Sequence, residues 1–207
     1  MSLSPPRKIN LGSGKDLRAD CLNIDIDEYW SPDILADVSG EFPPGGRARY
    51  ATKRFGEIEI AHGAFDEIIC KDVLEHVPDL VRTMTNCLSL LKVGGVFNIL
   101  VPYDLSYGAW QDPTHIRAFN ERSWLYYTDW FWYLNWTTHR FVLKQLSFSP
   151  SPLGQQMAAG GVAQDVVLRT PRAVDSMTVS LEKVELSESD RAVLKAARPS
   201  RTPSEQR

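Results

Sequence analysis

The sequence predicts an α/β fold with a mostly parallel central sheet, flanking helices and a late antiparallel strand. Short apolar segments separated by connections predict buried strands at 8–12, 21–26, 33–38, 65–71 and 96–103. Strands of this kind suit a parallel sheet with crossover connections. Residues 176–186 instead alternate apolar and polar side chains, which is typical of a late, antiparallel strand.

The strongest helical pattern in the chain runs from Val73 to Leu91. Its apolar residues recur at steps of three and four, as they do on one face of a helix. Asp72 stands just before the pattern, where an N-cap belongs, and Glu75 follows three residues later as in a capping box. The two glycines of LKVGG end the pattern. We expect Glu75 and its neighbour His76 to serve this helix and its packing.

The other segments have weaker patterns. Residues 140–149 predict a strand, and 149–161 predict a loop. Residues 162–170 fit either a strand or part of an insertion. The basic stretch 47–63 has no clear assignment, except that GEIEI within it has the composition of a short strand.

The length of 207 residues favours one domain with short appendages. We expect a flexible N-terminal arm at 1–7, a single domain over 8–194 and a disordered tail at 195–207. The domain includes an aromatic-rich insertion at 104–136. Its run WLYYTDWFWYLNW has three interpretations, which are core packing, the wall of a pocket, and a patch facing a membrane or a second copy. We expect core packing for most of these residues.

Composition narrows the class of protein. Hydrophobic residues make up 43% and charged residues 24%, which is ordinary for a globular domain, and the formal net charge is −3. A general nucleic-acid binder needs a basic face, so nucleic acid is an unfavoured partner, although the basic stretch leaves a local patch open. The three cysteines lie among apolar residues, as buried free thiols do. The cysteines show no metal-ligand spacing, and the N-terminus has no signal-peptide core, so we expect no metal and a cytoplasmic location.

Acidic residues follow the predicted strands where a ligand would bind. Gly12 and Gly14 form a turn after the first strand, and Asp25, Asp37 and Asp72 follow the next three. Ligands of parallel α/β sheets bind at these carboxyl ends. A carboxylate accepts hydrogen bonds from ribose hydroxyls, and this chain lacks both the GxGxxG and the GxxxxGK[ST] phosphate motifs. The pattern favours a cationic nucleoside without phosphates, which is the chemistry of S-adenosylmethionine.

The segments INLGSG, LNIDID, PDILADV, FDEIICKDVLEHVPDL and LLKVGGVFNILVPY resemble the class I S-adenosylmethionine-dependent methyltransferases, and most closely a compact, methyltransferase-11-like branch. The resemblance covers roughly residues 8–125 and implies a Rossmann-like fold. It also implies that S-adenosylmethionine is the cofactor. The contacts that it implies are Leu11, Gly12, Ser13, Gly14, Asp25, Ile26, Asp37, Val38, Lys71 and Asp72. The short spacing from Gly14 to Asp25 indicates that the usual first helix is shortened or replaced by a turn.

The methyl acceptor would be handled by the segment after the fifth strand. Tyr103, Trp110 and Arg117 are candidate substrate contacts. His115 is the first candidate for a general base because histidine titrates near neutrality, with Asp112 close enough in sequence to orient it. Asp104 and Asp112 are alternative bases.

A second interpretation of this segment involves no catalysis. In it, DPTH is a turn that Asp112 caps and in which His115 bonds to the backbone.

The expected function is methyl transfer to an oxygen or nitrogen of a small molecule or sugar. A non-catalytic module that binds or assembles, and a methyltransferase acting on nucleic acid, are the alternatives. We expect no membrane partner and consider a homodimer compatible with the aromatic patch.

Overall fold

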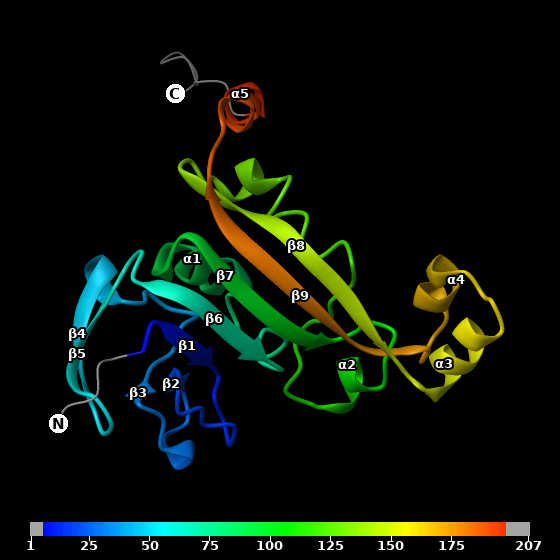
Figure 1. Cartoon of the computed structure of the whole chain (residues 1–207), viewed down its shortest axis with the longest axis horizontal. Helices are drawn as coiled ribbons and strands as arrows, with labels where there is room; N and C mark the ends of the chain where they lie inside the picture. The colour runs from blue at the N-terminus through cyan, green and yellow to red at the C-terminus, as the bar shows by residue number, and fades with distance from the viewer. Residues whose placement is uncertain (1–5, 198–207) are drawn as a thin grey trace, which may run out of the picture.

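The computed structural model describes residues 6–197 and contains one seven-stranded sheet in the order β3-β2-β1-β6-β7-β9-β8. Figure 1 shows this sheet running through the middle of the molecule. Its strands are β1 (Lys8–Leu11), β2 (Leu22–Asp25), β3 (Ile34–Leu35), β6 (Phe65–Lys71), β7 (Leu91–Pro102), β8 (His139–Pro150) and β9 (Val174–Glu185).

The sheet is parallel except at β9. Strands β1, β2, β3, β6 and β7 pair in parallel, whereas β9 pairs antiparallel with both β7 and β8. The predicted parallel sheet with a late antiparallel strand is confirmed. Because β1, β2, β3 and β6 run in the same direction, their carboxyl ends meet at one edge of the sheet.

Helix α1 (Leu80–Leu90) is shorter at its start than the sequence predicts. Asp79, not Asp72, is its N-cap, and the Asp79 carboxylate accepts a hydrogen bond of 2.8 Å from the Arg82 N–H. Asp72 has φ +53°, in the left-handed region, and lies in a bend. The apolar period before residue 79 therefore belongs to a buried loop. Pro78 explains the difference, because a proline disfavours helical backbone at the residue before it.

The remaining helices are α2 (Gly108–Gln111), α3 (Pro152–Ala159), α4 (Gln164–Arg169) and α5 (Glu188–Ala197). The predicted loop at 149–161 is wrong over α3, where Ser151 caps the Gly154 N–H and Pro152 occupies the first turn. Residues 162–170 contain helix α4 instead of a strand. Figure 1 places α3 and α4 together at one end of the molecule, beyond the ends of β8 and β9.

The predicted termini are only partly described. Helix α5 continues through residues 195–197, which the sequence assigns to a disordered tail. Residues 1–5 of the predicted arm and 198–207 of the predicted tail lie outside the described residues. No helix of residues 6–197 has the length and apolar character needed to cross a membrane.

The basic stretch forms a two-stranded antiparallel hairpin of β4 (Arg47–Thr52) and β5 (Gly56–Ala61). Ile58 and Ile60 of β5 are buried in the same core as the central sheet. Arg47 and Arg49 pair across the hairpin with Glu59 and Glu57 at 3.4 and 3.1 Å. These pairs offset most of the positive charge that the sequence suggested for a nucleic-acid patch.

The aromatic insertion is built mainly from turns, with a short 3-10 helix η3 (Phe131–Leu134). Two further 3-10 helices are η1 (Glu28–Trp30) and η2 (Pro44–Gly46). The core interpretation is confirmed for Trp124, Tyr127, Phe131 and Trp136, which are all buried.

Candidate functional site

A cavity of about 350 Å³ opens at the carboxyl ends of β1, β2, β3 and β6. The residues that line it are Leu11, Gly12, Gly14, Ile24, Asp25, Ile26, Ala36, Asp37, Val38, Asp72, Val73, His76, Val77 and Pro78. Eight of the ten cofactor contacts that the resemblance implies are among them. The structure thus brings the glycine turn and the acids at or just after the ends of β2, β3 and β6 to one site.

Gly12 is required by the packing of the turn. It has φ +62°, and a Cβ built there would stand 2.2 Å from Cγ2 of Val73. Its N–H donates to the Ile24 carbonyl at 2.8 Å, which fixes the turn against β2. Gly14 also has a positive φ, of +47°, but its Cβ would meet open space. The two glycines therefore differ, since side-chain volume is excluded only at Gly12.

The carboxylate of Asp25 joins the glycine turn to the end of β2. One oxygen accepts the Gly14 N–H at 2.7 Å, and the other accepts the Asp27 N–H at 2.9 Å. A carboxylate has about four acceptor positions, so each oxygen keeps capacity for a ligand hydroxyl. Asp37 is arranged similarly, with its Oδ1 accepting from both the N–H and the hydroxyl of Ser39.

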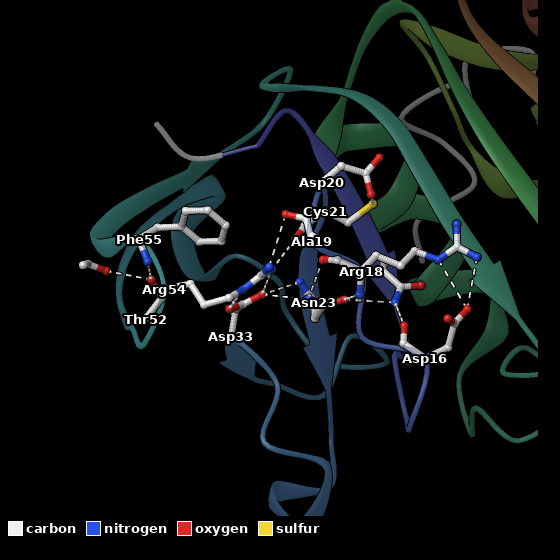
Figure 2. A network of polar contacts seen from close by, with 12 residues as sticks. Asp16, Arg18, Ala19, Asp20, Cys21, Asn23, Asp33, Thr52, Arg54 and Phe55 are labelled. Carbon is white, nitrogen blue, oxygen red and sulfur yellow. Dashed lines mark hydrogen bonds and ion pairs between the residues drawn. The ribbon is translucent and has the colours of Figure 1, made fainter. Parts of the chain in front are cut away.

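A further acid, Asp33, bonds to β2 from the segment just before β3 (Figure 2). The Arg54 guanidinium donates to both of its carboxylate oxygens, at 2.7 and 2.6 Å, and also to the carbonyls of Ala19 and Cys21. The backbone and side chain of Asn23 donate to the same carboxylate. Burial acts to raise the pKa of Asp33, but the bonds from Arg54 and Asn23 outweigh it and hold the pKa below its ordinary value.

The chemistry of the cavity fits S-adenosylmethionine. Three carboxylates line it, and no lysine or arginine of the described chain does. A pyrophosphate would meet no cationic side chain there, whereas a sulfonium and an ammonium group would meet carboxylates. Asp25 and Asp37 would hold the ribose and adenine parts, and the tight turn at Gly12 and Gly14 leaves room for the methionine part.

Two histidines and a glutamate gather at one end of the cavity. The ring centroids of His76 and His115 lie 4.5 Å apart with their planes near perpendicular, and His115 Nε2 lies 4.0 Å from Oε1 of Glu75. Glu75 is 1% exposed, and neither of its carboxylate oxygens has a hydrogen-bond partner within residues 6–197. Burial raises the pKa of Glu75 to about 7. The sequence assigned Glu75 and His76 to helix packing, so their place beside the cavity was missed.

The orientation of His115 agrees with the turn interpretation and differs from the interpretation in which Asp112 orients it. Its Nδ1 donates to the Ala109 carbonyl at 3.1 Å, as in the turn interpretation of DPTH. The Asp112 carboxylate bonds to Thr114 instead, which lowers the pKa of Asp112. Because a carbonyl only accepts, the proton lies on Nδ1 of neutral His115 and the lone pair lies on Nε2, facing Glu75.

The other candidate residues lie apart from the cavity lining. Ser13 is buried beside the turn, and Lys71 is exposed at the end of β6. Asp104 accepts from the Asn120 side chain at 3.0 Å. The hydroxyl of Tyr103 donates to Glu121 at 2.7 Å, and burial raises its pKa.

Trp110 and Arg117, the two remaining predicted substrate contacts, have contrasting surroundings. The Trp110 side chain is 64% exposed. The Arg117 guanidinium donates to the carbonyls of Leu74, Val77 and Pro78, so it holds the loop that carries Glu75 and His76. No signal in the sequence indicates this contact, because 39 to 43 residues separate the partners.

Residues 11–99 match a protein family described as "Methyltransferase domain". A probable S-adenosylmethionine-dependent methyltransferase from Mycolicibacterium smegmatis is 26% identical over 117 residues, which are 53% of this chain and 43% of that protein. The chain thus spans less than half the length of this curated relative.

Solved structures share the fold. A SAM-dependent methyltransferase from Archaeoglobus fulgidus aligns with a TM-score of 0.55 at 12% identity, over 86% of both chains. A SAM-dependent methyltransferase from Methanosarcina mazei aligns with a TM-score of 0.51 at 12% identity, over 86% of this chain and 92% of its own. The match over residues 11–99 thus shows a resemblance to a methyltransferase domain, and the sheet shares the fold of the solved S-adenosylmethionine-dependent methyltransferases.

Proposed function

We propose that this protein transfers a methyl group from S-adenosylmethionine to an oxygen or nitrogen atom of a small molecule or sugar. The observation that carries the proposal is the cavity, which joins a tight glycine turn to acids at three strand ends and has no lysine or arginine of the described residues in its lining. The bound cofactor supplies an activated methyl group on a sulfonium. In the transfer, the acceptor atom forms a bond to the methyl carbon while the sulfur–carbon bond breaks and its electron pair stays on sulfur.

The protein residues would bind, align and deprotonate. Asp25 and the glycine turn would fix the cofactor, because their mutual hydrogen bond of 2.7 Å leaves acceptor positions on the carboxylate. The acceptor would enter at the end of the cavity formed by His76, Val77 and Pro78. A hydroxyl acceptor must lose a proton, and the groups suited to help are the imidazoles of His76 and His115 beside Glu75.

A small acceptor is favoured over nucleic acid by the charge of the β4–β5 hairpin. Its arginines Arg47 and Arg49, which would attract nucleic acid, are paired with acids. The three buried free cysteines fit the cytoplasmic location that we propose. A homodimer through the exposed aromatic residues stays a prediction.

Calorimetric titration with S-adenosylmethionine, with its demethylated product and with NAD tests the cofactor site. We expect the two sulfur nucleosides to bind and NAD not to bind. Asp25→Asn should weaken binding by roughly 10- to 100-fold, because an amide accepts fewer hydrogen bonds and carries no charge for the cation. Asp165→Asn, an exposed acid on α4, is the matched control and should bind as the unmodified protein does.

Equal binding of NAD, or full binding by Asp25→Asn, would overturn the assigned cofactor site. With binding established, a screen of hydroxyl and amine acceptors that follows the demethylated product identifies the substrate.

A further inference from the structure

We propose that Glu75, His76 and His115 form a binding site for a divalent transition-metal ion of the zinc type at the acceptor end of the cavity. One donor atom from each residue lies within 4.8 Å of the others. Two imidazoles and one carboxylate, with a further position open to water or substrate, form a common donor set for zinc in enzymes.

The spacing of the donors suits a shared ion. Zinc bonds of about 2.0–2.2 Å can join donors up to roughly 4 Å apart. His115 Nε2 and Glu75 Oε1 are separated by 4.0 Å, and both side chains are at least 93% buried. Tetrahedral bonds of this length place two donors about 3.4 Å apart, so this pair would approach further on sharing an ion. The donors of the whole group lie within 4.8 Å of one another and would close around the ion in the same way.

Both imidazoles are already oriented as metal ligands usually are. His115 donates Nδ1–H to the Ala109 carbonyl at 3.1 Å. The Thr114 hydroxyl donates to the Asp112 carboxylate at 2.7 Å, so the same hydroxyl accepts from Nδ1–H of His76 at 2.9 Å. In each ring the lone pair therefore lies on Nε2. Support of the distal ring nitrogen by a carbonyl or a carboxylate-linked group is the usual surrounding of a metal-binding histidine.

Glu75 gives an independent reason for a cation. Its side chain is 1% exposed, and within the described chain both oxygens are without hydrogen-bond partners. A buried carboxylate without a partner is costly, and such a group in a folded protein calls for an ion or another partner. A divalent cation between the carboxylate and the two imidazoles would supply that partner.

The position of the metal site beside the cavity suggests a role for the ion in methyl transfer. This role rests on the proposed function. His76 belongs both to the metal group and to the cavity lining. A cation bound beside His76 would be reachable from the cavity, where it would bind an acceptor oxygen and lower the pKa of the acceptor hydroxyl. The site thus narrows the acceptor class to molecules that present a hydroxyl, with a second oxygen nearby favoured because both can bind the ion.

Metal binding is tested on the purified full chain after treatment with EDTA. Titration with zinc chloride should give one ion per chain, and cobalt(II) should give the visible absorption of a low-coordinate site. Glu75→Gln and His115→Ala should each weaken zinc binding at least 100-fold, whereas His62→Ala and His139→Ala, at the other two histidines, should not change it. Thr114→Val should weaken zinc binding about 10-fold, because this substitution removes only the hydrogen bond that supports His76.

The outcomes separate the two proposals. Absence of stoichiometric zinc binding, or equal losses in His62→Ala and Glu75→Gln, would overturn the metal site even where S-adenosylmethionine binds. Zinc binding without binding of S-adenosylmethionine would leave the metal site and remove the proposed cofactor. Circular dichroism of each variant in EDTA verifies that the fold is retained, and near-isosteric Glu75→Gln and Thr114→Val keep the test valid if His115→Ala does not fold.

Discussion

Asp33 and Glu75 are both buried carboxylates, but their surroundings are opposite. Asp33 is 8% exposed and receives hydrogen bonds from Arg54 and Asn23 (Figure 2). Glu75 is 1% exposed and has no hydrogen-bond partner within residues 6–197. Asp33 has its counter-charge inside the chain and serves the fold. Glu75 has no such donor, and beside it lie the two imidazoles with which we propose that it binds a metal ion.

The largest effect should follow from removing the partner of Asp33. Arg54→Met leaves a buried carboxylate without its counter-charge, so we expect the free energy of unfolding to fall by about 3 kcal/mol, at the low end for a buried pair because Arg54 is 33% exposed. Urea denaturation followed by circular dichroism measures it. In the double variant Asp33→Asn with Arg54→Met, the free energy of unfolding should fall by less than the sum of the decreases in the two single variants. An additive result would show that the pair is not coupled.

The same pair should make stability depend on pH. The folded-state pKa of Asp33 lies below its ordinary value of 3.8, so its contribution is present above that value and is lost as pH falls through the lower folded pKa. The stability difference between the unmodified protein and Arg54→Met should therefore narrow below about pH 4. Denaturation curves between pH 3 and pH 7 provide the measurement, and a constant difference over that range would contradict the assignment.

Replacing Glu75 when no metal is present should change the free energy of unfolding less than Arg54→Met does, and should not lower it. Glu75→Gln in EDTA removes a charge that has no partner, so we expect unfolding free energy to stay constant or rise by about 1 kcal/mol at pH 8. With zinc added, the unmodified protein should become more stable than Glu75→Gln, because only the unmodified protein is stabilised by binding the ion. Thermal melting with and without zinc measures both differences. A loss of several kcal/mol in EDTA would mean that Glu75 has a structural partner within the fold.

The smallest effect should come from the exposed pair of Arg49 and Glu57 on the hairpin. Both side chains are more than 60% exposed, and the bond is 3.1 Å. Exposed pairs contribute roughly 0–1 kcal/mol, so Arg49→Met should change stability by less than about 0.5 kcal/mol. It is the control for Arg54→Met, because both arginines lie in or next to the same hairpin. Equal losses in the two variants would mean that burial of the pair is not what sets its strength.

The strands were predictable because each has a local signature. Short apolar segments, a glycine turn and an acid after the strand were sufficient to locate β1, β2 and β6 and most of the cavity lining. The start of α1 was not predictable. Residues 73–77 bury their apolar side chains with the same spacing as a helix, but they form turns. Helix α3 was missed since its glycine and proline suggested a loop, although the Ser151 cap and Pro152 in the first turn are helix-start signals.

The histidine cluster depended on contacts that the sequence does not reveal. Glu75 and His76 are 39 or 40 positions from His115, and only the folded chain brings them together. The pairing of Asp112 was also wrong in detail, because the Asp112 carboxylate supports His76 through Thr114 and not His115. Of the two interpretations of residues 112–115, the turn interpretation gave the right neighbours for Asp112 and His115, and the general-base interpretation did not.

Arg117 determines whether the insertion and the loop at 74–78 can be exchanged separately with segments of another protein. Its guanidinium donates to three carbonyls of the loop at 74–78, and that loop carries two of the three proposed metal ligands. An exchange of residues 104–122 with the corresponding segment of another protein would leave those carbonyls without donors unless an arginine arrives in the same place. The insertion and the loop therefore depend on each other structurally. Chimeras that take only one of the two from another protein should lose the site, whereas chimeras that take both together should keep it.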